Sequence, residues 1–323
     1  MTVRQFVLLA MAAAGCGFLI ATDAAAQSYP QRQIRIIVDR PAGVPHDILA
    51  RALSDKLSAS LKQTVIVDNR TGAGGNLAAE FVARSAPDGY TFLVALDTTL
   101  SVNPTLYKNL SINPHTDLRP LSIMATSSNM LVVHPSIPPK SVAEFVAYAK
   151  ANPVSYAHGG NGSPGHLTME LFRMKAGFPA TPVPYRGNAQ LATDLAAGQI
   201  KIGFVGTGGV IEHVRAGRLR GLATSAAKRL IAAPEIPTIA EAGYDFQVET
   251  YFVLAVPAAT PEPVAALIER EVRSALQAPD LIERFHRVNI DIAATSAAEA
   301  RDRLDADTRL WAKVIEATGM HVD

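Results

Sequence analysis

The sequence predicts an α/β fold of two open lobes, each built on a mostly parallel sheet that is flanked by helices. Strand-like runs alternate with helical runs along most of the 323 residues, an order typical of parallel sheets. The alternation forms two series, one before and one after Leu121. Glycine-rich loops at 72–75, 159–165 and 206–209 each follow a strand-like run. They are therefore expected at the carboxyl ends of strands, where α/β proteins bind ligands.

The first series is expected to form the core of one lobe. "IRIIVD" is a short apolar run typical of a buried strand, and the residues after it carry apolar side chains at helical spacing. Strands are predicted at 34–39, 64–69 and 91–96, with helices at 46–61 and 76–86 and a turn at 87–89.

The second series begins with "MLVVHP" and continues into a helix with Ser141 at its N-cap and Glu144 completing a capping box. The amphipathic tail is expected to pack as helices on sheets that are already formed. We predict that residues 27–125 with 251–323 form the first lobe, and that residues 126–250 form the second. Strands of the second series are predicted at 130–135, 181–187 and 200–206, and helices of the series and tail at 141–152, 189–199, 261–277 and 298–317.

Composition limits the possible partners. The chain is 48% hydrophobic and 18% charged with a net charge of +1. Nucleic-acid binding is not expected, because a surface that binds phosphates usually shows as an excess of basic residues.

The first 26 residues are predicted to be a signal peptide that directs export to the periplasm. Arg4 precedes an apolar stretch, and Ala24–Ala26 offers a cleavage site before Gln27. The stretch is short for a membrane span. The single cysteine, Cys16, lies inside it, so the exported chain is expected to have no disulfide and no catalytic thiolate; lipidation of Cys16 stays open.

The glycines after the strand at 64–69 do not form a nucleotide-binding motif. The dinucleotide pattern that starts at Gly72 requires glycine at position 77, where the chain has Leu77, and no Lys-Ser/Thr pair follows for a P-loop. Such a turn still presents backbone N–H groups at a helix N-terminus, which favours anions in general.

Ser163 is the one candidate nucleophile. "NGSPG" approaches the Gly-x-Ser-x-Gly elbow, with Asn161 in place of the first glycine and His166 only three residues on. A serine hydrolase that uses Ser163 is therefore the weaker alternative. We expect Ser163 to cap the following helix and to help hold an anion, and we expect no catalytic residue and no cofactor.

The eight histidines show no metal-ligand spacing, so no metal site is expected. His46, His158 and His166 differ from the others because each lies in a strand-to-helix loop, where it could face the cleft. Asp47, at a helix start, is expected to serve as N-cap and to orient the loop so that amides near Gly43 point into the cleft.

Several blocks together resemble the extracytoplasmic receptors of tripartite tricarboxylate transporters, the Bug family. The likeness covers essentially the whole exported chain. It rests on "YPQRQIRIIV", "HDILAR", "VDNRTGAGGNLAAEFVARSAPDGYT", "GNGSPGHL", "VPYRGNAQLATDLAAGQI", "RAGRLRGLATS" and "PEIPTIAEAGY", in that order.

This resemblance implies a periplasmic binding protein of the Venus-flytrap type, a monomer that closes on a small carboxylate and delivers it to the permease subunits in the membrane. Loop amides and hydroxyls would hold the carboxylate. A periplasmic sensor for the same ligands would share the site. The implied contacts are Gly43, Pro45, His46, Asn76 and Thr98 in the first lobe, and His158, Gly160, Asn161, Ser163, Tyr185 and Thr207 in the second, with Asp47 and His166 organising the loops.

The chain departs from the family pattern at three places. In the first loop Val44 takes the place of the family's second glycine and His46 that of its usual hydroxyl donor. His158 stands where the family often has serine, and Val205 where many relatives have aspartate. We hypothesise that these changes favour an anionic ligand, an aromatic or aliphatic dicarboxylate, since an imidazole can donate a hydrogen bond. An unchanged preference for an ordinary acid is the alternative.

Overall fold

The computed structural model describes residues 29–322, so the predicted signal peptide and Cys16 lie outside the described residues. The predicted α/β class is confirmed. In the first half of the chain the elements are β1 (Ile34–Val38), α2 (Pro45–Leu61), β2 (Val65–Asn69), the 3-10 helix η1 (Ala73–Gly75), α3 (Asn76–Ala83), β3 (Thr91–Leu96), α4 (Asp97–Ser101), α5 (Asn103–Leu106), α6 (Pro114–Asp117) and β4 (Leu118–Val133).

The remaining elements complete the second lobe and then return to the first. They are α7 (Val142–Ala151), β5 (Ser155–His158), α8 (Pro164–Ala176), β6 (Thr181–Pro184), α9 (Asn188–Ala196), β7 (Ile202–Gly206), α10 (Thr207–Arg215), β8 (Arg220–Thr224), β9 (Glu249–Pro257), α11 (Glu262–Leu276), α12 (Pro279–His286), β10 (Asp291–Ile292) and α13 (Ala297–Thr318).

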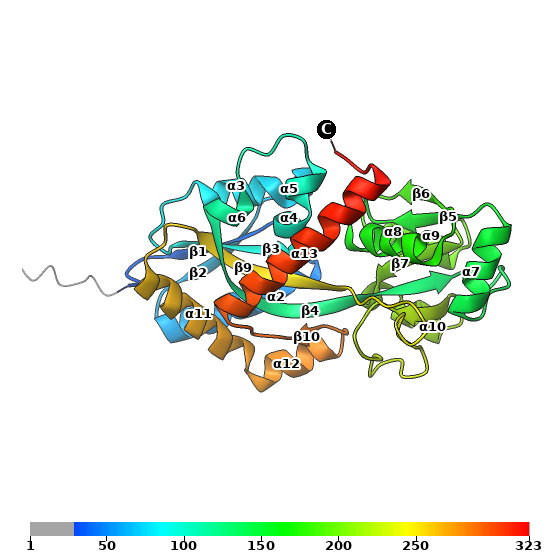
Figure 1. The fold of residues 1–323 in the computed structure, drawn as a ribbon. Coiled ribbons are helices and arrows are strands. Elements are labelled where there is room, and N and C mark those ends of the chain that lie inside the picture. Colours follow the sequence, from blue (N-terminus) through cyan, green and yellow to red (C-terminus); the bar gives the residue numbers. More distant parts are fainter. Residues whose placement is uncertain (1–28, 323) are drawn as a thin grey trace, which may run out of the picture.

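One continuous sheet runs through both lobes, in the order β2-β1-β3-β9-β4-β7-β5-β6, with β8 and β10 paired to β4. The strands β1, β2 and β3 are parallel to one another, as are β5, β6 and β7. Figure 1 shows the first group in one lobe and the second group in the other, each with helices around it. The carboxyl ends of these parallel strands lead into the loops predicted to bind a ligand.

The central strands β4 and β9 were not predicted correctly. The predicted strand at 130–135 is only the end of the 16-residue β4, and the nine-residue β9 was missed. Both strands are antiparallel to their neighbours, in a sheet that the sequence predicted to be mostly parallel. β4 pairs with β9 up to Ser128 and with β7 from Asn129 onward, so the change of partner marks where the lobes join. The lobe boundaries at 125/126 and 250/251 stay a prediction.

Burial on two faces explains the apolar composition of β1. Ile34, Ile36 and Val38 pack with α2 and α11 on one face of the first-lobe sheet, and Ile37 packs with α3 and the start of α13 on the other. All four side chains are 0% exposed. A strand covered on both faces needs apolar residues at successive positions, so it shows no alternation.

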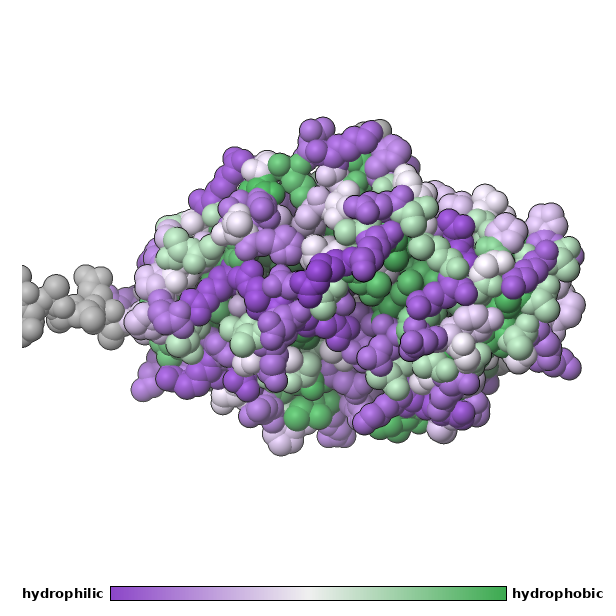
Figure 2. All heavy atoms as spheres, in the orientation of Figure 1, coloured by the Kyte–Doolittle hydropathy of each residue, from purple (hydrophilic) through white to green (hydrophobic). Residues whose placement is uncertain are grey.

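Helix α13 crosses both lobes. Its first turn is fixed by a capping box between Ser296 and Glu299. Leu304 belongs to the first-lobe core, whereas Trp311, Val314 and Ile315 pack in the second-lobe core. Figure 1 shows α13 running diagonally over the junction, and Figure 2 shows that its outer face is hydrophilic. Each of these three buried side chains contributes about 1.5–3 kcal/mol, so α13 holds the lobes together.

No helix within residues 29–322 is long and apolar enough to cross a membrane.

Candidate functional site

A buried carboxylate at the end of β1 holds the first-lobe loops together. Asp39 is 0% exposed and accepts hydrogen bonds from the Thr99 hydroxyl at 2.6 Å, the His46 ring at 3.1 Å and the Leu96 amide at 3.2 Å. Its Oδ2 also lies 2.8 Å from the Arg40 guanidinium. Burial favours the neutral acid, but Arg40, His46 and Thr99 together hold the pKa of Asp39 below its usual value. Asp39 therefore stays ionised.

The partners of Asp39 show why a glycine is needed after β2. Gly75 has φ +100°, and a Cβ atom there would collide with the Thr99 hydroxyl, Arg40 and Asp39. The glycine cluster at 72–75 thus lets the chain pass close to this carboxylate. The nearby Gly74 carbonyl accepts from Thr99 and from Asn103, and Asn103 also donates to the Asn76 side chain.

His46 lies inside the first lobe. Its side chain is 4% exposed, its Nε2 donates to Asp39, and its ring centroid is 5.3 Å from that of Phe252. The neighbouring Pro45 is exposed, and Thr98 on α4 is buried. His46 therefore supports the loop from behind through one ring nitrogen.

Asp47 organises its loop, but not as the N-cap. Val44 is at the N-cap of α2, because Pro45 takes the first helical position. Asp47 reaches back to accept a hydrogen bond from the Gly43 amide at 2.8 Å and also pairs with Arg51 and Asn69. Asp47 thus takes up the Gly43 amide itself, and the expectation that other amides near Gly43 point into the cleft stays a prediction.

The loop between β5 and α8 closes around one carbonyl oxygen. The Gly160 carbonyl accepts from the His158 Nδ1 at 2.9 Å and from the Ser163 amide at 3.0 Å. The Gly162 amide donates to His166 Nδ1 at 3.2 Å. The amides of Gly160 and Asn161 have no acceptor within the described chain, so they are free to meet a ligand.

Two histidines that flank this loop stack on each other: His158 ends β5 and His166 lies in the first turns of α8, so neither is in the loop itself as predicted. The ring centroids of His158 and His166 are 3.9 Å apart with an interplanar angle of 12°. Burial lowers the pKa of His158, and burial followed by His158 and Arg173 lowers that of His166 to about 3. Both rings are therefore neutral at pH 7, which allows them to lie face to face.

Two polar atoms in this loop lack a partner within the described chain. They are Nε2 of His158 and Oγ of Ser163, both buried. Ser163 is at the N-cap of α8, as predicted, but its side chain makes no capping hydrogen bond. Within residues 29–322 no base contacts its hydroxyl, whereas a serine nucleophile is activated by an adjacent general base.

Thr207 interacts with Ser128 of β4, and Tyr185 with Asp194 of α9. The Thr207 hydroxyl donates to the Ser128 carbonyl at 2.8 Å and lies 3.1 Å from the Ser128 hydroxyl, which ties α10 to the hinge strand β4. Burial and the carboxylate of Asp194 raise the pKa of the half-buried Tyr185.

The lobes touch close to these loops. A Cβ atom on Gly162 would collide with Leu106 of α5, and one on Gly208 would lie 3.1 Å from the Val288 carbonyl that follows α12. The β5–α8 loop therefore lies against α5, and the start of α10 lies against the segment after α12, so segments that precede β4 and follow β9 in the chain meet these loops.

A second buried carboxyl lies at the start of α4. Asp97 is 3% exposed and accepts a hydrogen bond from the Tyr251 amide of β9 at 3.3 Å. Burial first, and then the Asp307 carboxylate on α13, raise the pKa of Asp97 to about 8, against smaller opposing effects that include Arg303. Asp97 is therefore mostly protonated at neutral pH.

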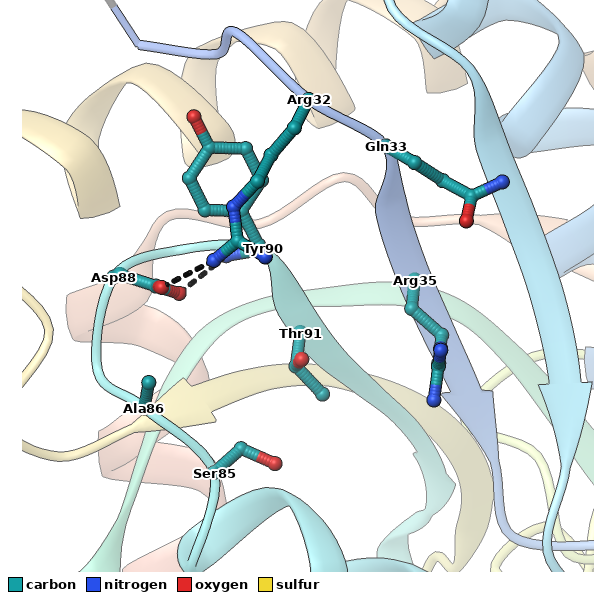
Figure 3. A pocket seen from close by; sticks show the side chains of 8 residues that line it. All are labelled: Arg32, Gln33, Arg35, Ser85, Ala86, Asp88, Tyr90 and Thr91. Atoms are coloured by element: carbon teal, nitrogen blue, oxygen red, sulfur yellow. Dashed lines mark hydrogen bonds and ion pairs between the residues drawn. The ribbon is translucent and has the colours of Figure 1, made fainter. Parts of the chain in front are cut away.

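The surface pocket in Figure 3 lies elsewhere. Arg35 and Thr91 place it at the amino ends of β1 and β3, opposite the loops described above. Its Arg32 pairs with Asp88 at 2.6 Å and lies 4.1 Å from the centre of the Tyr90 ring. Because this cation already has partners, the pocket is a poor candidate for an anion.

Within residues 29–322, no three histidine, cysteine or acidic side chains come together as a set of metal ligands.

The comparisons with known proteins decide the family. Residues 49–320 match the family described as "Tripartite tricarboxylate transporter family receptor". The chain belongs to this receptor family. It is 33% identical over 304 residues to Protein BugT of Bordetella pertussis, covering 93% of both chains.

Two solved structures are similar to this receptor in fold as well as in sequence. One is "R. palustris Rpa4515 with adipate", at 31% identity and a TM-score of 0.81, covering 91% of this chain and 99% of that chain. The other is MatC from Rhodopseudomonas palustris with bound malate, at 27% identity and a TM-score of 0.78, covering 89% and 100%. The two-lobed periplasmic binding protein fold and the Bug-family resemblance are thus confirmed, and the chain belongs to a family of solute-binding receptors.

Sequence reasoning missed three polar residues. Asp39 was noticed only as the end of a strand, although an acidic residue that directly follows a fully apolar run is a usable signal. Asp97 was also missed, although it follows the apolar run "TFLVAL" in the same way, whereas the neighbours of Ser128 gave no such signal.

Proposed function

We propose that this receptor binds one small dicarboxylate between its lobes and delivers it, chemically unchanged, to the permease subunits of a tripartite tricarboxylate transporter. One observation carries this proposal: the β5–α8 loop holds two free backbone amides and two unpartnered buried polar atoms next to first-lobe elements. Two similar proteins, moreover, are named with adipate and with malate.

The proposed contacts come from both lobes. In the second lobe the amides of Gly160 and Asn161 are free donors for a carboxylate. We assign the ligand-facing surface to the predicted residues Gly43, Pro45, Asn76, Thr98, His158, Gly160, Asn161, Ser163, Tyr185 and Thr207, with His46, Asp47 and His166 supporting them from behind.

Closure would follow from these contacts, because a ligand held by both lobes stabilises the state in which they meet. We further propose that residues 1–26 direct export to the periplasm and that the receptor acts as a monomer. The ion pairs and hydrogen bonds of Asp39 would keep the first-lobe loops in place in both states.

The test uses residues 27–323 produced with and without denaturation and refolding. Small molecules released by denaturation are identified by mass spectrometry, and the refolded protein is screened by thermal shift against aliphatic, hydroxy, amino and aromatic carboxylates. A ligand at 100 times its Kd stabilises the folded state by about 2.7 kcal/mol, which gives a clear shift. Absence of any shift with every acid after refolding would refute the proposed function.

A further inference from the structure

His158 has a fixed tautomer. Its Nδ1 lies 2.9 Å from the Gly160 carbonyl oxygen, and because a carbonyl only accepts, Nδ1 must carry the hydrogen. The side chain is 0% exposed, and burial lowers its pKa despite the Gly160 carbonyl and the Glu170 carboxylate. In the neutral ring Nε2 is then a bare acceptor.

This acceptor is unsatisfied within the described chain. Neutral His166 covers one face of the ring, and its own Nδ1 accepts from the Gly162 amide. The charged groups nearby are Glu170 and Arg173, which pair with each other, while the Tyr156 hydroxyl donates to Glu170. These partners leave no donor for Nε2 of His158.

Ser163 supplies the complementary unsatisfied group in the same loop. Its Oγ is buried without a partner, and a hydroxyl can both donate and accept. The turn around the Gly160 carbonyl holds His158 and Ser163 together, since both hydrogen-bond to that oxygen. A group that donates to His158 and accepts from Ser163 would satisfy both.

We propose that His158 and Ser163 select a hydroxylated carboxylate, whose hydroxyl donates to His158 Nε2 and accepts from Ser163 Oγ. This inference rests on the proposed function and adds the substrate class to it. It also replaces the hypothesis that the His158 imidazole donates to a carboxylate, because its only N–H already serves Gly160.

A plain dicarboxylate could accept from the Ser163 hydroxyl but would leave Nε2 of His158 unpaired. A carboxylate oxygen only accepts, so it would repel the lone pair of Nε2. Because leaving a buried polar group unsatisfied is costly, the hydroxylated acid is expected to bind about tenfold more tightly than the acid that lacks the hydroxyl.

The experiment measures matched pairs of acids by isothermal titration calorimetry on the refolded receptor. The pairs are succinate with malate, glutarate with 2-hydroxyglutarate, and adipate with 3-hydroxyadipate. The expected result is a preference of about tenfold for the hydroxylated member of the pair that fits best. His158→Phe keeps a ring that can stack on His166 but removes the acceptor, and should bring the preference to within about twofold.

His321→Phe is the matched control. The His321 Nδ1 lies 3.1 Å from a glycine carbonyl two residues away, as in His158, but this histidine is exposed at the C-terminus. The preference should survive this change. If His158→Phe does not fold, Ser163→Ala decides, because it removes the second group and should also reduce the preference.

Three results would overturn the inference: equal or tighter binding of the plain acid, an unchanged preference in folded His158→Phe, or tighter binding of aspartate or glutamate than of the matching hydroxy acid. The last would assign an ammonium, which can donate to His158 but cannot accept from Ser163. Failure to bind any acid would instead refute the proposed function, so the two failures are distinguishable.

Discussion

Replacing Asp97 with asparagine should stabilise the receptor, and increasingly so as the pH rises. Asp97 is buried between α4, β9 and α13 and has a pKa of about 8, whereas an unfolded aspartate has a pKa near 3.8. Between these values the folded state binds a proton that the unfolded state lacks. The stability of the wild-type protein therefore falls as the pH rises through this window.

The magnitude follows from linkage. A difference of one bound proton changes the free energy of unfolding by about 1.4 kcal/mol per pH unit. Between pH 5 and pH 7 the wild type should therefore lose about 2.7 kcal/mol from this group alone. Asp97→Asn keeps a side-chain oxygen to accept the Tyr251 amide and has no charge to bury, so it removes this loss.

The assay is urea denaturation of both proteins at pH 5, 6 and 7, followed by far-UV circular dichroism. The advantage of Asp97→Asn over the wild type should grow by about 1.4 kcal/mol at each step. Asp302→Asn, on the exposed side of the same helix α13, is the control for the loss of one negative charge. An advantage that stays constant from pH 5 to pH 7 would show that Asp97 is not protonated in the folded state.

Three further predictions concern the packing that positions the site. Gly165→Ala should lower the free energy of unfolding, measured by urea denaturation, by about 2 kcal/mol or more, because the new Cβ would collide with the Phe204 carbonyl. Gly209→Ala is the control: it has open space around it and should be neutral or slightly stabilising. Equal effects of the two substitutions would contradict this packing. Asp39→Asn should lower the free energy of unfolding by about 3 kcal/mol, since it leaves the guanidinium of Arg40 without its carboxylate. A decrease below about 0.5 kcal/mol would mean that Asp39 does not anchor the loops. Trp311 is the only tryptophan and packs in a core shared by α5, α8 and α13. Its fluorescence should therefore change when a ligand that raises the melting temperature is added. An unchanged spectrum at saturation would show that α13 does not respond to closure.

Much of the fold could be predicted from the sequence because the parallel strands β1, β3 and β7 are largely buried on both faces. Their continuous apolar runs and the glycine turns that follow them are visible without any structure. The hinge strands were harder to predict. β4 contains Pro120 and several polar residues that break the apolar run, although "ETYFVLAVP" in β9 was a sufficient signal that was overlooked.

The site could be predicted only as a set of loops. The sequence placed His46 and His158 after strands, but hydrogen-bond partners decide what each ring can do. Asp39 takes the Nε2–H of His46, and the Gly160 carbonyl fixes the tautomer of His158. Such pairings depend on distances of about 3 Å between side chains and backbone, which residue spacing does not determine.

The most direct test of the proposed receptor function combines binding and recovery in one sample. The acid that gives the largest thermal shift is titrated into refolded receptor in a calorimeter, and the mixture is then denatured and the acid analysed by NMR. We expect one saturable site per chain and quantitative recovery of the unchanged acid. Conversion of the acid into another compound, or the absence of a saturable site, would contradict it.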